Sequence, residues 1–111
     1  MVRPPFIVLL LGVLTAAAAA AAEPGPALIS ITQRQFAPQE LQLPAGVKVR
    51  LLVKNTDALP AEFESYDLSR EVIVPPHGSV TVFIGPLAPG KYQFFNDFNP
   101  DAKGWIVVTK P

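Results

Sequence analysis

The sequence predicts an all-β protein, a two-layer sandwich of about seven short strands. Apolar and polar residues alternate with a period of two in several short runs, and proline and glycine clusters bound these runs. The 13 prolines fit this fold because proline is tolerated at strand ends and turns. No stretch of useful length after residue 22 shows the helical period.

The first 22 residues have the layout of a secretory signal peptide. Arg3 precedes the short apolar run Phe6–Leu14, and a tract of small residues follows. We expect cleavage after Ala22, which leaves residues 23–111 as one exported, periplasmic domain with no stable membrane span. The alternative is a retained anchor, because the alanine tract could lengthen the apolar run toward the roughly 20 residues that a membrane span needs.

Seven strands are expected in residues 23–111. They lie at residues 28–36, 41–43, 47–55, 71–75, 79–85, 91–95 and 105–110. The clearest is 47–55, where apolar residues alternate with Lys48, Arg50 and Lys54, and Leu52 is the one exception. Asn55–Arg70 is expected to be one long connection, a place where ordered loops often carry function. Phe94 and Trp105 border strands and are expected in the core.

Composition and charge exclude several functions. Nine basic residues balance nine acidic ones without a basic tract, so nucleic-acid binding has no support. No cysteine is present, which excludes disulfides, thiolate metal ligation and thiol catalysis. The single histidine, His77, stands in a Pro/Gly turn, and no Ser/His/Asp set or phosphate loop is found. We therefore do not expect an enzyme.

Four stretches together resemble the cupredoxin family: "FAPQELQLPAGVKVRLLVKNTD", "LPAEFES", "IGPLAPGKYQFF" and "GWIVV". The resemblance is greatest to the EfeO-type branch of periplasmic iron-uptake proteins. That branch typically has "EFES" after the third strand and "FFDDFH" before the last one. Here the motifs read "EFES" at Glu62–Ser65 and "FFNDFN" at Phe94–Asn99. The resemblance implies a Greek-key β-sandwich with metal at one end, periplasmic handling of iron or copper, and a membrane iron permease or another metal-uptake component as partner.

The resemblance also implies where copper ligands would stand. They fall at or near Ala61, Asn96 and Asn99, where blue-copper proteins have a His, a Cys and a second His. A type-1 copper site needs the thiolate to set its electronic character. Since the chain has no cysteine, it cannot be a type-1 copper electron carrier.

Oxygen donors remain as candidate ligands. Glu62 and Glu64 are two residues apart, so in an extended segment they project to one face. Asp97 lies in the last loop, which the fold would bring beside them. Three carboxylates converging at one end of the sandwich would suit a hard cation such as iron(III), calcium or manganese. We hypothesise an iron or copper site of Glu62, Glu64 and Asp97, with Asn99 and Asp101 as weaker ligands.

The alternative is that these carboxylates are solvated loop residues, or that Glu62 pairs with Arg70 or Lys103. Asn99 stands where the family pattern has a histidine, and Asn is a weak, neutral ligand. In that case the chain is a metal-free accessory or protein-interaction domain with a degenerate metal site.

Overall fold

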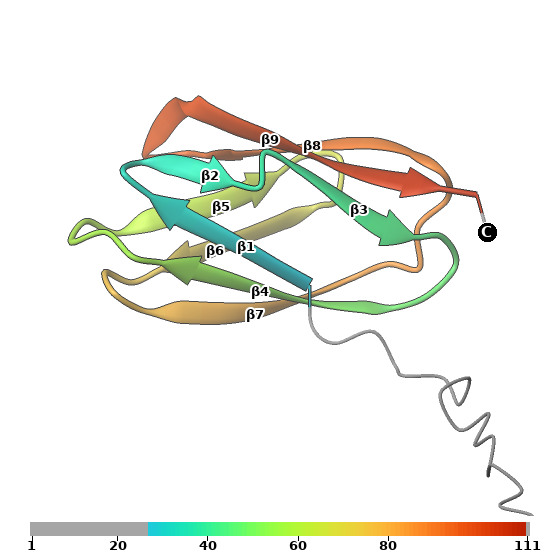
Figure 1. Cartoon of the computed structure of the whole chain (residues 1–111), viewed down its shortest axis with the longest axis horizontal. Coiled ribbons are helices and arrows are strands. Elements are labelled where there is room, and N and C mark those ends of the chain that lie inside the picture. The colour runs from blue at the N-terminus through green and yellow to red at the C-terminus, as the bar shows by residue number, and fades with distance from the viewer. Residues whose placement is uncertain (1–26, 111) are drawn as a thin grey trace, which may run out of the picture.

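The described part of the chain, residues 27–110, is built of β-strands in the computed structural model (Figure 1). The expected signal peptide at residues 1–22, with its cleavage after Ala22, lies outside these residues. The strands are β1 (Ala27–Thr32), β2 (Gln35–Ala37), β3 (Glu40–Pro44), β4 (Val49–Asn55), β5 (Ala61–Ser65), β6 (Arg70–Val74), β7 (Ser79–Ile84), β8 (Gly90–Asn96) and β9 (Asn99–Thr109). No helix in the described range could span a membrane. The all-β prediction is confirmed.

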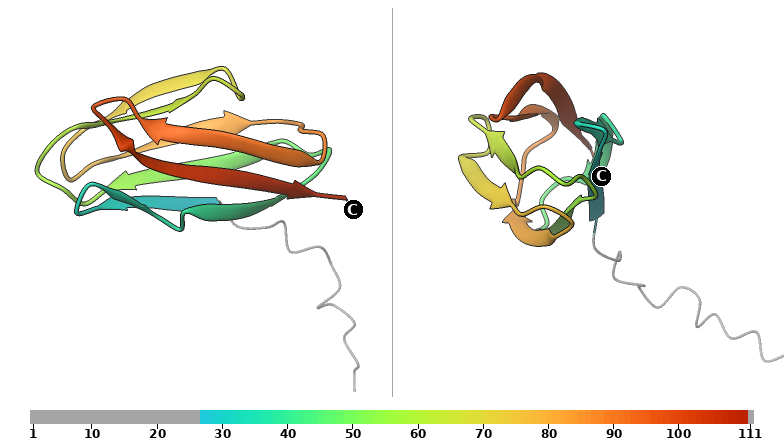
Figure 2. Two further views of the ribbon diagram at one scale, coloured as in Figure 1. Left: turned by 90° about the horizontal axis from the view of Figure 1, so that it is seen from above. Right: turned by 90° about the vertical axis from the view of Figure 1, so that its left-hand side faces the viewer.

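The strands form two sheets that face each other as a sandwich (Figure 2). One sheet has the order β2-β1-β4-β7 and the other β3-β9-β8-β5-β6. The pairs β1–β4 and β3–β9 are parallel, and the remaining pairs are antiparallel. The chain changes sheet between β2 and β3, β3 and β4, β4 and β5, β6 and β7, and β7 and β8. Such crossings are typical of Greek-key sandwiches.

The core forms where alternate side chains of both sheets point inward. Three aromatic rings lie at its centre. The Phe36 and Phe94 rings meet edge to face with centroids 4.9 Å apart, and those of Phe63 and Phe94 are 5.2 Å apart. Such pairs contribute about 0.5–1.5 kcal/mol each beyond the burial of their area. Because Phe36 belongs to β2 and the other two belong to β5 and β8, this cluster joins the two sheets.

The structure has nine strands in the described residues where the sequence predicted about seven. The expected strand 28–36 is divided into β1 and β2 by a turn at Gln33 and Arg34, whose φ angles are 50° and 63°. The expected long connection contains a further strand, β5. Ala61 and Phe63 alternate with two glutamates, but two apolar residues are too short a pattern to predict a strand, although Phe63 points into the core and is fully buried.

The connection between β8 and β9 is also shorter than expected. β8 continues to Asn96 and β9 begins at Asn99, so only Asp97 and Phe98 form the turn. Phe94 lies in the core as expected, but the expectation for Trp105 is wrong. Trp105 is 37% exposed, and the Lys91 ammonium lies 5.2 Å from its ring centroid. The inward position belongs instead to Gly104, which pairs with Phe94 across the two strands.

Gly104 leaves the space that the Phe94 ring occupies. A Cβ at residue 104 would overlap that ring and lie 2.8 Å from the carbonyl oxygen of Gln39. This oxygen accepts a hydrogen bond from the Trp105 amide at 2.7 Å. We therefore expect Gly104→Ala to lower the free energy of unfolding by about 1–3 kcal/mol through overpacking, measured by urea denaturation. Lys103→Ala, at an exposed neighbour, should change it by less than about 0.5 kcal/mol. Equal effects of the two substitutions would contradict this account of the core.

Candidate functional site

Three carboxylates gather on the outer face of the five-stranded sheet. Glu62 and Glu64 belong to β5, which lies between β8 and β6. Because Phe63 points into the core, both glutamates point the other way. The amide of Asp97 donates to the carbonyl oxygen of Glu62 at 3.0 Å, which places the β8–β9 turn beside the start of β5. Ligand oxygens of Glu62, Glu64 and Asp97, here called the acidic cluster, lie within 4.8 Å of one another.

Burial and repulsion destabilise the charged form of Glu62. Its side chain is 7% exposed and that of Glu64 9%, whereas Asp97 is exposed. Burial raises the pKa of Glu62 to about 7, helped by a hydrogen bond with Glu71 and by the charge of that residue. A hydrogen bond with Glu64 and the charge of Asp97 act in the same direction. The cluster therefore favours either a proton or a cation among its oxygens.

Glu71 is the residue of this region that the sequence did not indicate. It lies at the start of β6, directly opposite Glu64 in the antiparallel pair of β5 and β6. Residues in this position share one face of the sheet. Only the strand register reveals this proximity, since seven positions separate the two glutamates in the chain.

The two weaker ligand candidates lie elsewhere. Asn99 is directed toward the turn between β1 and β2, where its Nδ2 donates to the carbonyl oxygen of Arg34 at 3.3 Å. Asp101 is exposed on β9 and does not join the acidic cluster. The structure therefore unites Glu62, Glu64 and Asp97 but not Asn99 or Asp101. Arg70, considered as an ion-pair partner of Glu62, donates to backbone carbonyl oxygens of Phe83, Leu68 and Ser69.

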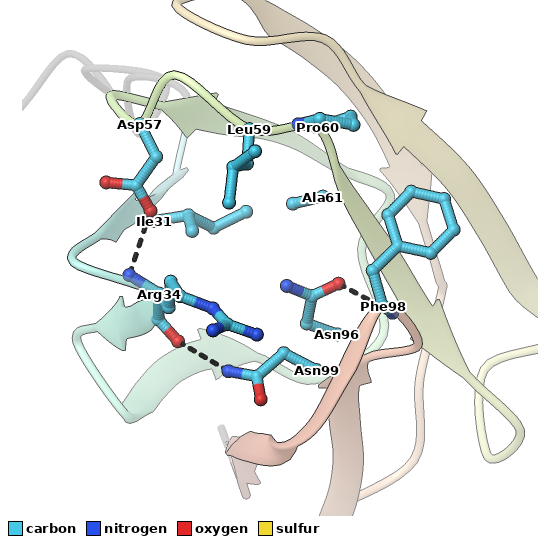
Figure 3. A pocket seen from close by; sticks show the side chains of 9 residues that line it. All are labelled: Ile31, Arg34, Asp57, Leu59, Pro60, Ala61, Asn96, Phe98 and Asn99. Atoms are coloured by element: carbon cyan, nitrogen blue, oxygen red, sulfur yellow. Dashed lines mark hydrogen bonds between the residues drawn. The ribbon is translucent and has the colours of Figure 1, made fainter.

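A separate pocket of about 230 Å³, here called the end pocket, opens at the end of the sandwich (Figure 3). It is lined by Ile31, Arg34, Asp57, Leu59, Pro60, Ala61, Asn96, Phe98 and Asn99. The lining includes Ala61, Asn96 and Asn99, the positions that the family resemblance assigned to copper ligands. The acidic cluster is thus not in the place where the resemblance put the metal.

The side chains in the end pocket do not fit a type-1 copper ion. Asn96 replaces the thiolate, and its Oδ1 accepts hydrogen bonds from the amides of Glu62 at 2.9 Å and Phe98 at 3.0 Å. Asn99 is held by the carbonyl of Arg34, and Ala61 has no donor atom in its side chain. Copper of this class needs imidazole and thiolate ligands. Here the side-chain amides of Asn96 and Asn99 form hydrogen bonds to the backbone instead.

Sequence comparison identifies the family of this sandwich. The profile of the cupredoxin-like domain matches residues 5–108. The chain belongs to the cupredoxin-like domain family. It is also 46% identical over 82 residues to the uncharacterized protein RP394 of Rickettsia prowazekii (strain Madrid E). That match covers 73% of this chain and 66% of the rickettsial protein, so this chain spans just under two thirds of its relative's length.

Solved cupredoxins share the fold at low sequence identity. Amicyanin from Paracoccus versutus is 17% identical with a TM-score of 0.61, and the match covers 85% of this chain and 89% of amicyanin. A purple cupredoxin from Nitrosopumilus maritimus is 18% identical with a TM-score of 0.58, covering 75% of this chain and 99% of that protein. These similarities confirm the cupredoxin-like sandwich that the sequence predicted.

The raised pKa of Glu62 predicts how the stability of the metal-free cupredoxin-like domain depends on pH. The folded state holds this proton more tightly than the unfolded chain, where the pKa is about 4.5. The resulting stabilisation is complete below about pH 4.5 and is lost as the pH rises through about 7. In the presence of EDTA, thermal unfolding followed by circular dichroism should therefore show a midpoint that falls between about pH 5 and pH 8. Glu62→Gln should flatten this fall, and Glu40→Gln, an exposed glutamate on β3, should keep it. An unchanged slope in Glu62→Gln would refute the assignment.

The hydrogen bonds of Asn96 predict a second effect. Asn96→Ala removes the acceptor of two amide groups and should lower the free energy of unfolding by about 1–3 kcal/mol. Asn96→Asp keeps a carboxylate oxygen in the same place and should lose less. Chemical denaturation of both variants measures the difference. A loss for Asn96→Asp as large as that for Asn96→Ala would show that the acceptor atom is not the stabilising feature.

Proposed function

We propose that this protein is an exported cupredoxin-like protein that binds or delivers a metal ion in periplasmic metal uptake. The observation that carries the proposal is the acidic cluster. Ligand oxygens of Glu62, Glu64 and Asp97 lie within 4.8 Å of one another, and the two glutamates are almost buried. The protein is not proposed as an electron carrier, because the thiolate of a type-1 copper site is absent from the sequence.

A cation explains why carboxylates are gathered in this position. Burying a carboxylate is unfavourable unless a partner compensates its charge, and neighbouring carboxylates repel each other. A bound cation removes both costs at once. Glu62, Glu64 and Asp97 offer oxygen ligands only, with Glu71 beside Glu62 as a fourth carboxylate. Such a donor set suits hard cations, among them iron(III), manganese and calcium, better than copper, which prefers nitrogen ligands.

The position of the cluster suits capture and release. Asp97 is exposed while Glu62 and Glu64 are nearly buried, so the site opens to solvent on the side of the β8–β9 turn. Water can complete the coordination on that side. A site with few protein ligands and an open face binds less tightly than a closed one, which suits a protein that passes its metal on.

The uptake role follows from the motifs. "EFES" contributes Glu62 and Glu64, and "FFNDFN" contributes Asp97. These are the two stretches that resemble the EfeO-type branch. Together with the signal-like N-terminus, they support a periplasmic protein in iron or copper uptake, whose partner is a membrane iron permease or another component of the same system.

The second candidate is a metal-free accessory or protein-interaction domain. The observation that favours it is the end pocket, where asparagine amides bond to the backbone in place of metal ligands. The metal content of the protein as isolated distinguishes the two candidates, because a tightly held stoichiometric metal is incompatible with the second.

The experiment is a titration of the domain with manganese(II), anaerobic iron(II), iron(III) citrate and copper(II) by calorimetry near neutral pH. We expect at least one hard cation to bind in the micromolar range. The double substitution Glu62→Gln and Asp97→Asn should weaken that binding by at least tenfold, about 1.4 kcal/mol, because it removes two of the ligand charges while keeping side-chain volume.

Glu40→Gln serves as the matched control, because it removes one exposed carboxylate from the outer face of the same sheet. Its affinity should equal that of the unchanged protein. Binding no tighter than millimolar for every cation, or full binding by the double variant, would overturn the metal proposal and favour the accessory domain.

A further inference from the structure

The end pocket contains a solvent-accessible hydrogen-bond donor that no acceptor in residues 27–110 satisfies. Asn96 is only 5% exposed, and its Oδ1 already accepts two backbone hydrogen bonds. Within residues 27–110 its Nδ2 has no hydrogen-bond partner. Figure 3 shows this nitrogen turned toward the middle of the pocket, while the oxygen of the same amide faces Phe98. This nitrogen is therefore reached by solvent through the pocket and is free to donate to a ligand that carries an acceptor atom.

A cationic side chain reaches the same space. Arg34 lines the pocket, and Figure 3 shows its side chain directed into the pocket toward Asn96 and Asn99. The described residues give its guanidinium no ion pair. Guanidinium groups bind carboxylates through two parallel hydrogen bonds, which makes Arg34 suited to a planar anion.

The backbone of Arg34 is held in place from two sides. Gln33 and Arg34 adopt left-handed φ angles of 50° and 63°, which are unfavourable for residues other than glycine. The Asp57 carboxylate accepts the amide hydrogens of both residues at 2.8 Å, and Asn99 donates to the carbonyl of Arg34. Each oxygen of Asp57 thus accepts a backbone hydrogen bond from the turn. Asp57 also lines the pocket, but both of its carboxylate oxygens accept hydrogen bonds from the turn that carries Arg34.

The remaining walls are apolar. Ile31, Pro60 and Ala61 line one part of the pocket, and Leu59 and Phe98 stand partly exposed as large apolar side chains. Its volume of about 230 Å³ is just below the range of about 300–1,000 Å³ that is usual for small-molecule pockets. The occupant must therefore be small, with an acceptor group at one end and an apolar body at the other.

We propose that the end pocket binds a small organic carboxylate. The guanidinium of Arg34 and the Nδ2 of Asn96 hold the carboxylate, and its apolar part packs against Ile31, Leu59 and Phe98. This site is independent of the proposed metal function. Glu62 and Glu64 project from the outer face of β5, whereas Ala61, on the opposite side of the same strand, faces the pocket.

The test is a titration of the isotope-labelled domain with sodium butyrate, followed by the side-chain amide signals of Asn96 and Asn99 in nuclear magnetic resonance. Butanamide, which has a similar shape but no charge, and sodium chloride at equal ionic strength are added in parallel. We expect a saturable shift of the Asn96 signal with butyrate and at least tenfold weaker binding of butanamide.

Three variants assign the contacts. Arg34→Gln should weaken butyrate binding by at least tenfold and leave the backbone spectrum otherwise unchanged, because the turn is held through main-chain groups. Asn96→Asp replaces the Nδ2 donor but keeps an acceptor for the amides of Glu62 and Phe98, so it should abolish butyrate binding. Because this variant has no side-chain amide signal, binding is followed at the backbone amide of Ala61. Arg50→Gln removes an exposed arginine on β4, away from the pocket, and should bind butyrate like the unchanged protein.

Each other outcome overturns the proposal. No saturable shift up to about 20 mM butyrate, a concentration that detects even millimolar affinity, would show that the pocket takes no such anion. Equal binding of butanamide would show that the charge is not recognised. Full binding by Arg34→Gln, or equal losses in Arg34→Gln and Arg50→Gln, would remove Arg34 from the site.

Discussion

The burial of Phe63 is the constraint on which both candidate sites depend. Its ring lies between β2 and β8 and contacts Phe36 and Phe94, so β5 cannot shift by one residue without expelling the ring into water. With Phe63 fixed inward, Glu62 and Glu64 must face outward. One aromatic side chain therefore decides on which surface of the sheet the carboxylates appear.

Asn96 connects the two sites through the backbone. It closes β8, accepts the amide hydrogen of Glu62, and directs its own amide nitrogen into the end pocket. The acidic cluster and the end pocket thus lie on opposite sides of β5 and share one hydrogen bond. In blue-copper proteins the end of the sandwich is a metal centre. In this chain the asparagine amides at the same end form hydrogen bonds to the backbone, and the acidic cluster lies on the outer face of the sheet.

The sequence predicted those parts of the structure that depend on local patterns. Alternation along residues 47–55 identified β4, and the spacing of Glu62 and Glu64 placed both on one face. β5 itself was missed because its alternating pattern contains only two apolar residues, Ala61 and Phe63, even though the strand lies inside its sheet between β8 and β6.

Features that depend on strand register were not predictable in this way. Glu71 lies beside the cluster only because β5 and β6 pair with Glu64 opposite it. Arg34 reaches Asn96 only because the β1–β2 turn folds over the end of the sandwich. Because neighbouring strand residues point to opposite faces, either Gly104 or Trp105 had to face the core. Gly104 does so, because the Phe94 ring fills the space that a side chain at this position would need.

The position of β9 has a consequence for the order in which the domain can assemble. This last strand lies inside its sheet, with β3 on one side and β8 on the other. β3 has no other partner in that sheet, so the first half of the chain cannot complete its second layer until the final residues are available. The two-layer sandwich can therefore be completed only when the last strand is available. If residues 1–22 act as the signal peptide that the sequence predicts, this dependence on the last strand would favour export before the sandwich is complete.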